Sequence, residues 1–314
     1  MGWLHVTKPG VLTTIQDEGR WGYQSSGVPV AGPMDVSSHR IANALVGNQR
    51  SAATLEVTLV GPELEFDDER VSAVAGADFA LMLDDRSVPL NTPFVAPAGS
   101  RLRFGSRRRG ARAYLAVAGG INVPPLFGSR ATHLPSAMGG IEGRALRTGD
   151  RLPLGDCRRA GRLATMRPPV FESTEHPPRV RVLPGPNQES FTSEALEILQ
   201  SAPYVVGSAS DRMGFRLQGL ALTHTRSADI ISDATPLGAL QVPASGQPIL
   251  LMADRQTTGG YPKIATVISA DVCVAGQLGP GDAISFVVCS PRDAMTALIA
   301  RERALMAFEA EVSC

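Results

Sequence analysis

The chain has 314 residues, which is enough for two domains of ordinary size. Its 30 basic and 30 acidic residues give a formal net charge of zero, and this excludes the strongly basic surface typical of nucleic-acid-binding proteins. With 32 glycines, 24 prolines and only 5% aromatic residues, the composition favours many short strands joined by tight turns over a bundle of helices.

The first part of the chain reads mainly as β-structure. Alternating apolar residues predict strands at residues 4–6 and 11–15, on either side of a turn at Pro9 and Gly10. Asp35 stands where it can cap a helix from Val36 to Val46, with Gly47 as the stop signal. Further strands are expected at residues 55–60, 64–66, 71–75, 79–83, 102–104 and 111–118. This first lobe therefore resembles a barrel or a sandwich.

A segment rich in arginine and proline, residues 158–178, marks the expected boundary between two lobes. We assign residues 1–165 to an N-terminal β-rich lobe, 178–290 to a C-terminal β-barrel lobe, and 291–314 to a C-terminal helix. The second lobe is expected to contain a short helix at 193–199 and strands at 180–183, 204–207, 230, 237–242, 249–252, 264–269 and 284–289. Ser290 and Pro291 start the last helix, whose apolar stripe comprises Met295, Leu298, Ile299, Leu305 and Met306.

The cysteines and the N-terminus bear on the compartment of the protein. The four cysteines show no Cys-x-x-Cys spacing, so neither a zinc site nor a disulfide framework is expected. The first residues lack the pattern of a signal peptide, and no stretch approaches about 18 uninterrupted apolar residues. We expect a soluble, cytoplasmic protein that binds neither nucleic acid nor membrane.

Two polar clusters are candidates for binding residues. Asp35, His39 and Asn43 are four positions apart and share one helix face, so they could line a polar cleft. The alternative is that Asp35 only caps the helix and His39 is solvated. Asp211 and Arg212 lie in a polar loop and could bind a carboxylate, an amide or a carbonyl group, or could only close a turn.

A third cluster, the segment from Met252 to Ala265, gathers many polar groups around two glycines. Asp254 could act as a base, while Arg255 and Lys263, one of two lysines in the chain, could hold an anion or a developing oxyanion. The alternative is an exposed hairpin loop. The apolar run at residues 248–252 argues against it, because such a run delivers the loop directly from a buried strand.

Missing signatures narrow the chemistry further. The chain has no Gly-Lys-Ser/Thr phosphate loop and no Gly-x-Ser-x-Gly turn, and its five histidines have no metal-ligand spacing. Neither lysine lies in the sequence context of a biotin carrier. We expect no metal and no cofactor bound by this chain alone.

Taken together, these segments resemble the family called allophanate hydrolase subunit 2, biotin-dependent carboxyltransferase or the 5-oxoprolinase C subunit, which includes the Kip-type kinase-inhibitor antagonist. The resemblance rests on motifs spread over nearly the whole chain: residues 12–17 with Gly19 and Arg20, 27–29 with Gly32, Met34 and Asp35, 42–48, 55–56, 112–121, 128–130, 182–186, 210–214 and 254–264.

The resemblance implies a two-lobed, mainly β architecture of the cyclophilin-like β-barrel type with a few helices. It also implies a subunit 1 partner, that is, the 5-oxoprolinase B subunit or a Kip-type inhibitor-like protein. In one branch of the family, a further, ATP-handling A subunit takes part in opening 5-oxoproline (pyroglutamate) to glutamate. In another branch, a carboxyltransferase moves carboxylate from carboxybiotin to urea. ATP would thus be bound by a partner, and carboxybiotin remains a possible co-substrate.

On this resemblance, Asp254, Arg255 and Lys263 are the expected catalytic residues. The expected substrate-binding residues, for a small amide or lactam, are Asp35, Asn43, Asp211, Arg212, Gln256, Thr257, Thr258, Gly259, Gly260 and Tyr261. Asp254 and Arg255 would orient or deprotonate the amide, and the threonines with the glycine backbone would donate hydrogen bonds to its oxygen.

Three functions stay open at this point. The first is a component of an ATP-dependent 5-oxoprolinase that is active only with its partners. The second is a carboxyltransferase component that acts on carboxybiotin and urea or another amide. The third is a non-enzymatic regulator that binds a kinase-inhibitor-like protein through exposed strand edges.

Overall fold

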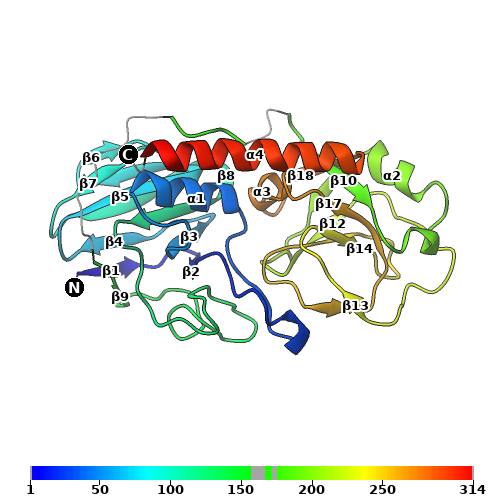
Figure 1. Ribbon diagram of the computed structural model, residues 1–314, viewed down its shortest axis with the longest axis horizontal. Helices are drawn as coiled ribbons and strands as arrows, with labels where there is room; N and C mark the ends of the chain where they lie inside the picture. Colours follow the sequence, from blue (N-terminus) through cyan, green and yellow to red (C-terminus); the bar gives the residue numbers. More distant parts are fainter. Residues whose placement is uncertain (1, 157–166, 172–174, 313–314) are drawn as a thin grey trace. The chain divides into compact units, whose positions relative to one another are not determined.

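A computed structural model describes residues 2–156, 167–171 and 175–312 (Figure 1). Contacts between Cα atoms divide the chain into two compact units. Unit 1 comprises residues 1–20, 31–170 and 304–314, and unit 2 comprises residues 21–30 and 171–303. The lobe boundaries proposed from the sequence stay a prediction, and much of the segment at 158–178 lies outside the described residues.

Unit 1 is built on one nine-stranded sheet in the order β2-β3-β8-β4-β1-β9, with β5 on the other edge of β8 and β6 and β7 paired to β5. Its strands are β1 (Trp3–Lys8), β2 (Leu12–Gln16), β3 (Thr54–Thr58), β4 (Glu63–Phe66), β5 (Arg70–Leu83), β6 (Arg86–Val88), β7 (Phe94–Ala96), β8 (Arg101–Val117) and β9 (Arg151–Pro153).

Four of the predicted strands are in fact parts of two long strands, β5 and β8. Residues 71–75 and 79–83 belong to one strand, as do 102–104 and 111–117. The two long strands run antiparallel from Ser72–Val117 to Leu83–Leu102, and their register shifts near Gly76 and Asp78. Gly76 is thus accommodated by irregular pairing inside a continuous strand.

Helix α1 (Val36–Leu45) forms where it was predicted and contacts β5 and β8 (Figure 1). Gly76 on β5 allows this close packing, because a Cβ atom there would lie 3.2 Å from the Ser38 side chain and 2.6 Å from the carbonyl oxygen of Arg112. The main core of unit 1 comprises apolar side chains from the strands and from the segment that follows β8, among them Leu4, Leu55, Phe66, Leu115 and Ile121. This core fixes the sheet on which α1 lies.

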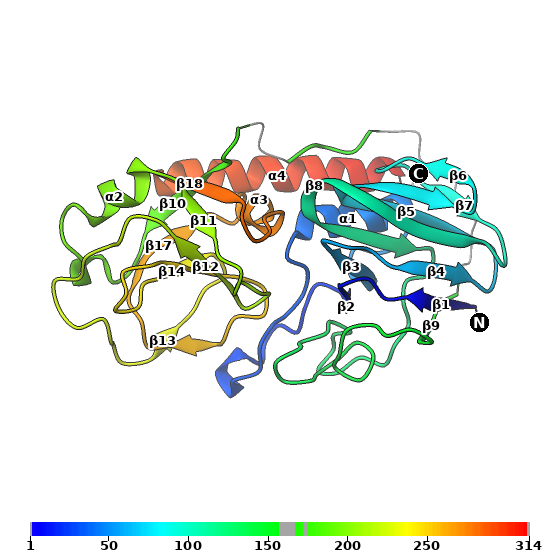
Figure 2. The same ribbon diagram turned by 180° about the vertical axis from the view of Figure 1, so that it is seen from behind.

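Unit 2 contains a closed seven-stranded barrel in the order β10-β17-β14-β15-β12-β11-β18 (Figure 2). The strands are β10 (Arg179–Pro184), β11 (Tyr204–Val206), β12 (Gly214–Gln218), β14 (Ala239–Gln241), β15 (Ile249–Leu251), β17 (Lys263–Val267) and β18 (Ala283–Val288). A separate pair joins β13 (Asp233–Ala234) to β16 (Thr258–Gly259). The mainly β class with a closed barrel is therefore confirmed.

One predicted strand of unit 2 is wrong, and one observed strand was not predicted. Ile230 lies outside any strand, although its amide N donates to the carbonyl oxygen of Gly260 at 2.8 Å. Strand β12, which begins at Gly214, follows the polar loop that contains Asp211 and Arg212 and was not predicted. Burial alternates along β12, where Phe215 and Leu217 are buried and Arg216 and Gln218 are exposed, but this pattern covers only a few residues.

The remaining helices are short except for the last. They are η1 (Gln24–Ser26), η2 (Gln188–Ser190), α2 (Ala195–Ser201), α3 (Val272–Gly276) and α4 (Pro291–Val312). Helix α4 starts at Pro291 as predicted, but of the expected apolar stripe Leu305 alone is buried, together with Phe308, while Met295, Ile299 and Met306 are exposed.

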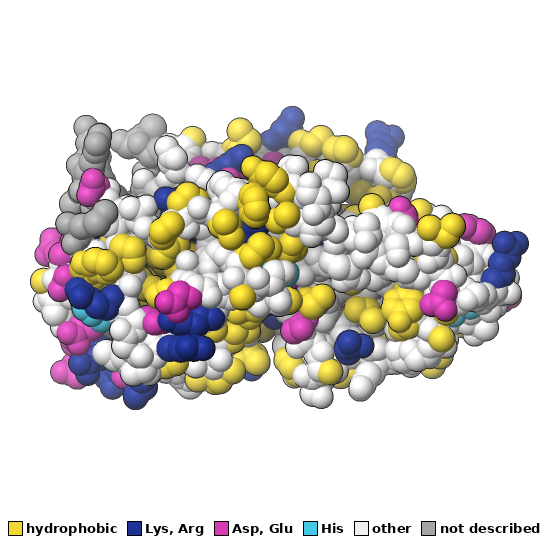
Figure 3. All heavy atoms as spheres, turned by 90° about the horizontal axis from the view of Figure 1, so that it is seen from below, with side chains coloured by type: hydrophobic (Ala, Val, Ile, Leu, Met, Phe, Trp, Pro, Cys, Tyr) yellow, Lys and Arg dark blue, Asp and Glu magenta, His cyan; other side chains and the backbone are white. Residues whose placement is uncertain are grey.

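The surface carries side chains of both charges, as the balanced composition predicts. On the face seen in Figure 3, basic and acidic side chains lie interspersed with hydrophobic ones. Within the described residues, none of the helices is both long and apolar enough to cross a membrane. Cys273 and Cys289 are free thiols, and Cys157 and Cys314 lie outside the described part of the chain.

Candidate functional site

The first predicted cluster is a buried hydrogen-bond network in unit 1. Asp35 caps α1, since its carboxylate accepts hydrogen bonds from the amide N of Ser38 at 3.0 Å and from the Ser38 hydroxyl at 2.6 Å. One turn further, the ring of His39 bonds to Thr54 Oγ1 at 2.9 Å and to the carbonyl oxygen of Arg50 at 3.0 Å. His39 is 0% exposed, so the alternative of a solvated histidine is wrong.

Asn43 completes this network one turn beyond His39. Its amide Nδ2 donates to the carbonyl oxygen of Ala52 at 2.9 Å, and its Oδ1 accepts from Asn48 Nδ2 at 3.0 Å. Asp35 and Asn43 are thus both buried and bonded inside unit 1. This geometry favours a structural role for both, and their assignment to substrate binding stays a prediction.

Glu56 and Tyr114 extend the network across the sheet. The Tyr114 hydroxyl donates to Glu56 Oε2 at 2.7 Å and accepts from the amide N of Asp35 at 2.8 Å, and Met34 N donates to the same Glu56 oxygen at 2.9 Å. Burial, reinforced by the negative charges of Glu56 and Asp35, raises the pKa of Tyr114 well above its ordinary value. The hydroxyl therefore stays protonated and fixes the start of α1 to β3 and β8.

In unit 2, a buried ion pair anchors the segment 252–265. The guanidinium of Arg212 donates to both carboxylate oxygens of Asp254 at 3.0 Å, and the two side chains are 4% and 0% exposed. The backbone repeats this link, because the amide N of Asp254 donates to the carbonyl oxygen of Arg212 at 2.8 Å. The structure therefore brings together two predicted site residues, Arg212 and Asp254, as an ion pair.

Asp211 and Arg255 take other partners. Asp211 Oδ1 accepts from the amide N of Met213 at 2.8 Å and closes the turn that leads into β12. Arg255 is half-buried, and its Nε donates to the carbonyl oxygen of Thr235 at 2.8 Å. Burial lowers the pKa of Arg255 below its ordinary value. Both side chains thus hold backbone in place.

Lys263 lies at an irregularity of the barrel. Leu240 on β14 faces Ala265 on β17, but the next residue, Gln241, faces Lys263, so the register shifts by one residue at Ile264. Such β-bulges re-aim side chains and are common beside active sites. The backbone N of Lys263 donates to Asn187 Oδ1 at 3.1 Å, and its side-chain Nζ lies 3.0 Å from Asp233 Oδ2.

The rest of the segment folds around Gln241. Gln256 Nε2 donates to Gln241 Oε1 at 3.2 Å, and Gln241 Nε2 donates to the carbonyl oxygen of Tyr261 at 3.2 Å. A Cβ atom at Gly259 would lie 2.5 Å from Gln241 Nε2, so a larger residue there would displace the Gln241 amide. We call Lys263, Asp233, Thr235, Gln241 and Gln256 the Lys263 cluster.

The predicted residues around this cluster differ in exposure. Thr258 and Tyr261 are exposed, and Thr257, Gly259 and Gly260 are partly exposed. Thr257 and Thr258 reach the cluster through backbone: the carbonyl oxygen of Thr257 accepts from Thr235 N at 3.1 Å, and Thr258 pairs with Ala234. The segment is therefore a folded wall of polar groups next to the barrel, and the alternative of a plain exposed hairpin loop fails.

Three residues of the Lys263 cluster were not singled out from the sequence. Asp233, Thr235 and Gln241 lie on β13, just after it and on β14, between 22 and 30 positions from Lys263 along the chain. No short-range pattern links them to the segment. Only closure of the barrel brings β14 beside β17, and only the β13–β16 pairing brings Asp233 beside the segment.

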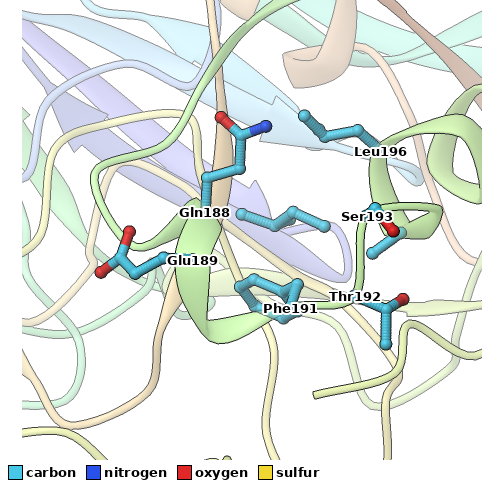
Figure 4. A pocket seen from close by; sticks show the side chains of 8 residues that line it. Gln188, Glu189, Phe191, Thr192, Ser193 and Leu196 are labelled. Atoms are coloured by element: carbon cyan, nitrogen blue, oxygen red, sulfur yellow. The ribbon is translucent and has the colours of Figure 1, made fainter. Parts of the chain in front are cut away.

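A groove of about 510 Å³ lies beside this wall, between η2 and α2 (Figure 4). Phe191, Leu196, Ala195 and Ile264 supply its apolar lining, and Gln188, Glu189, Thr192 and Ser193 its polar lining. The lining includes none of the residues predicted to bind substrate. It touches the segment through Ile264, the residue that follows Lys263.

Known proteins resemble this chain in sequence over most of its length. The protein is 42% identical over 294 residues to the 5-oxoprolinase C subunit of Escherichia coli, covering 94% of each chain. It is 37% identical over 281 residues to the 5-oxoprolinase C subunit of Haemophilus influenzae, covering 90% of this chain and 89% of that protein.

A solved structure gives the same result for the fold. The crystal structure of the Kluyveromyces lactis urea amidolyase superposes with a TM-score of 0.87 and 32% identity. It covers 98% of this chain but 20% of that much longer protein. The family resemblance inferred from the motifs is confirmed, because the family described as carboxyltransferase domain, subdomain A and B, matches residues 26–288. The chain therefore belongs to the carboxyltransferase domain family.

Proposed function

We propose that this protein is the C subunit of an ATP-dependent 5-oxoprolinase, which opens 5-oxoproline to glutamate together with its partner subunits. The observation that carries this proposal is the match of 94% of the chain to 94% of a 5-oxoprolinase C subunit at 42% identity. A match over 94% of both chains supports the same division of subunits as well as the same domain.

In this proposal a subunit 1-type partner, the B subunit, completes the site, and a separate A subunit handles ATP. The cytoplasmic location expected from the sequence belongs to the same proposal. The chain's own contribution is to bind and orient the lactam, because its polar groups gather in the segment 252–265 and the Lys263 cluster.

The chemistry of the cluster fits a small lactam that bears a carboxylate. 5-Oxoproline presents a carboxylate, an amide N–H and an amide carbonyl. Lys263 supplies a cationic donor for the carboxylate, and the polar backbone around Gly259 and Gly260 supplies donors and acceptors for the amide. Arg255 and Gln256 hold this backbone in position. We assign Asp254 to fixing the segment, since both of its oxygens accept hydrogen bonds from Arg212.

The test is reconstitution from purified subunits. The chain, mixed with its B-type and A-type partners, is expected to release glutamate from 5-oxoproline in an ATP-dependent way. Each component left out in turn should abolish the release. If the complete and correctly assembled mixture releases no glutamate, the proposal is wrong.

A second candidate function is a carboxyltransferase component that uses carboxybiotin as a substrate. It is favoured by the family described for residues 26–288 and by the likeness to the urea amidolyase structure. The paired subunits would then consume free carboxybiotin faster when urea or another amide is present. An unchanged rate across a panel of amides would count against this function.

A further inference from the structure

The salt bridge between Lys263 and Asp233 joins two side chains in very different surroundings. The Lys263 side chain is 1% exposed, whereas the Asp233 side chain is 57% exposed. A buried ammonium needs a partner, because leaving it without one is costly. An exposed carboxylate has no such need, since water solvates it well. The pair therefore serves Lys263 more than it serves Asp233.

The two ends of the pair are also held with different firmness. Lys263 begins β17, which pairs with both β10 and β14 of the closed barrel, and its backbone N is bound by Asn187. Asp233 belongs to β13, a strand of two residues, and residues 231–234 are all exposed. Within the described residues, the strand partner of β13 is β16 alone. The lysine is thus part of the frame, and the aspartate lies on a lightly attached edge.

The ammonium group has unused capacity as a donor. It carries three N–H bonds, and within the described residues its hydrogen-bond acceptor is one oxygen, Asp233 Oδ2 at 3.0 Å. Buried donors are normally satisfied, so a group with spare donors beside a polar wall calls for a further acceptor. The acceptor now present is a carboxylate, which indicates the chemistry that the site takes.

We propose that Asp233 stands in for a ligand carboxylate at Lys263, and that a carboxylate-bearing substrate displaces it on binding. The released Asp233 side chain turns to water, while Lys263 exchanges one carboxylate partner for another. Asp233 thereby keeps the buried lysine paired in the free protein. A neutral amide cannot displace it, because it brings no negative charge to replace the carboxylate at Lys263. That the ligand is 5-oxoproline rests on the proposed function, whereas the exchange of carboxylates rests on the pair itself.

The first test compares Asp233→Asn with the wild-type full chain, alone and in complex with its partners. Asn keeps the size of the side chain but cannot compete as an anion. We expect the dissociation constant for 5-oxoproline, titrated through the ligand-induced rise in Tm, to fall roughly two- to fivefold, as removal of an exposed ion-pair competitor predicts. The neutral lactam 2-pyrrolidinone should show no gain.

Two further variants control this experiment. Asp229→Asn removes another exposed aspartate of unit 2, one that pairs with no lysine or arginine among the described residues, and should leave the affinity unchanged. Lys263→Met should remove the response to carboxylates altogether. Acetate and glutamate serve as carboxylate probes that do not depend on the proposed substrate. An unchanged or weaker response of Asp233→Asn to every carboxylate would overturn the inference.

A second measurement needs no variant. In the wild-type chain, saturating carboxylate should speed amide hydrogen exchange at residues 231–234, because Asp233 no longer tethers β13. Slower exchange there would mean that Asp233 stays in place and would also overturn the inference. If the complex releases no glutamate but Asp233→Asn still gains affinity for acetate, the proposed function fails and the exchange of carboxylates at Lys263 stands. If the complex releases glutamate but Asp233→Asn gains affinity for no carboxylate, the proposed function stands and the exchange of carboxylates fails.

Discussion

At the scale of single residues, two of the buried basic side chains, Lys263 and His39, have different kinds of partner. Lys263 is 1% exposed and lies 3.0 Å from a carboxylate oxygen. His39 is 0% exposed and bonds to a hydroxyl and a backbone carbonyl instead. Burial lowers the pKa of His39 from 6.5 to about 4, so the neutral ring is the form that packs inside unit 1.

This shift predicts how stability depends on pH. Below pH 6.5 the unfolded chain binds a proton at His39 that the folded chain refuses until about pH 4. The contribution of His39 to the free energy of unfolding should therefore be fully present above pH 6.5. It should fall by about 3 kcal/mol as the pH drops from 6.5 to 4.

Urea denaturation of the wild type and of His39→Gln across this range measures the effect. The slope of the free energy of unfolding against pH should be smaller in the variant, by the equivalent of up to one proton. Equal slopes in wild type and His39→Gln would contradict the argument.

At the scale of elements, the loop after β10 holds the start of β17 in place. Gly185 N donates to the carbonyl oxygen of Ile264 at 2.8 Å, and the Asn187 side chain accepts from Lys263 N. The backbones approach so closely that a Cβ atom on Gly185 would overlap the carbonyl oxygen of Lys263. Gly185 is thus required by packing, since it allows the contact that positions Lys263.

Gly185→Ala should lower the free energy of unfolding by about 1–3 kcal/mol through overpacking, and should weaken substrate binding as well. Gly260→Ala is the matched control for stability, because its Cβ would meet nothing nearer than the carbonyl oxygen of Ile230 at 3.5 Å. Chemical denaturation compares the two variants, and a KM measurement on the assembled complex tests Gly185→Ala. Equal losses of stability in the two variants would refute the role given to Gly185.

At the scale of the whole molecule, the two units contribute different kinds of polar network. In unit 1, Asn48 joins Asn43 to the carbonyl oxygen of Val117 and the amide N of Gly119, and these bonds serve the fold. In unit 2, the Lys263 cluster joins a buried cation to the exposed Asp233, the partly exposed Gln256 and the buried Thr235 and Gln241, and so brings polar groups from the interior to the surface. Stability and substrate binding should therefore respond to different substitutions.

Asn48→Ala should lower the free energy of unfolding by about 1–3 kcal/mol, because it leaves buried partners unsatisfied. The KM of the assembled complex for 5-oxoproline should stay within about twofold of the wild type. Lys263→Met should do the opposite: a small change in stability and a KM raised about tenfold or more. A raised KM in Asn48→Ala, measured at a temperature where it is fully folded, would contradict this division.

Much of the architecture could be predicted from local signals. Asp35 followed by an apolar stripe and Gly47 predicted α1, Ser290-Pro291 predicted the start of α4, and alternating residues predicted β1 and β2. Strand propensity between turn residues predicted β3. The continuity of β5 and β8 could not be predicted, because a bulge at a glycine looks like a break until the partner strand is known.

For the candidate site, the sequence by itself pointed to the polar segment 252–265 and predicted Lys263 as a site residue. The tertiary structure alone decided who their partners are. Arg212 turned out to neutralise Asp254 across 42 positions, and Asp233 to pair with Lys263 across 30. Partners at such separations are chosen by barrel closure and strand register, which depend on the packing of the whole unit and leave no pattern in a short stretch of residues.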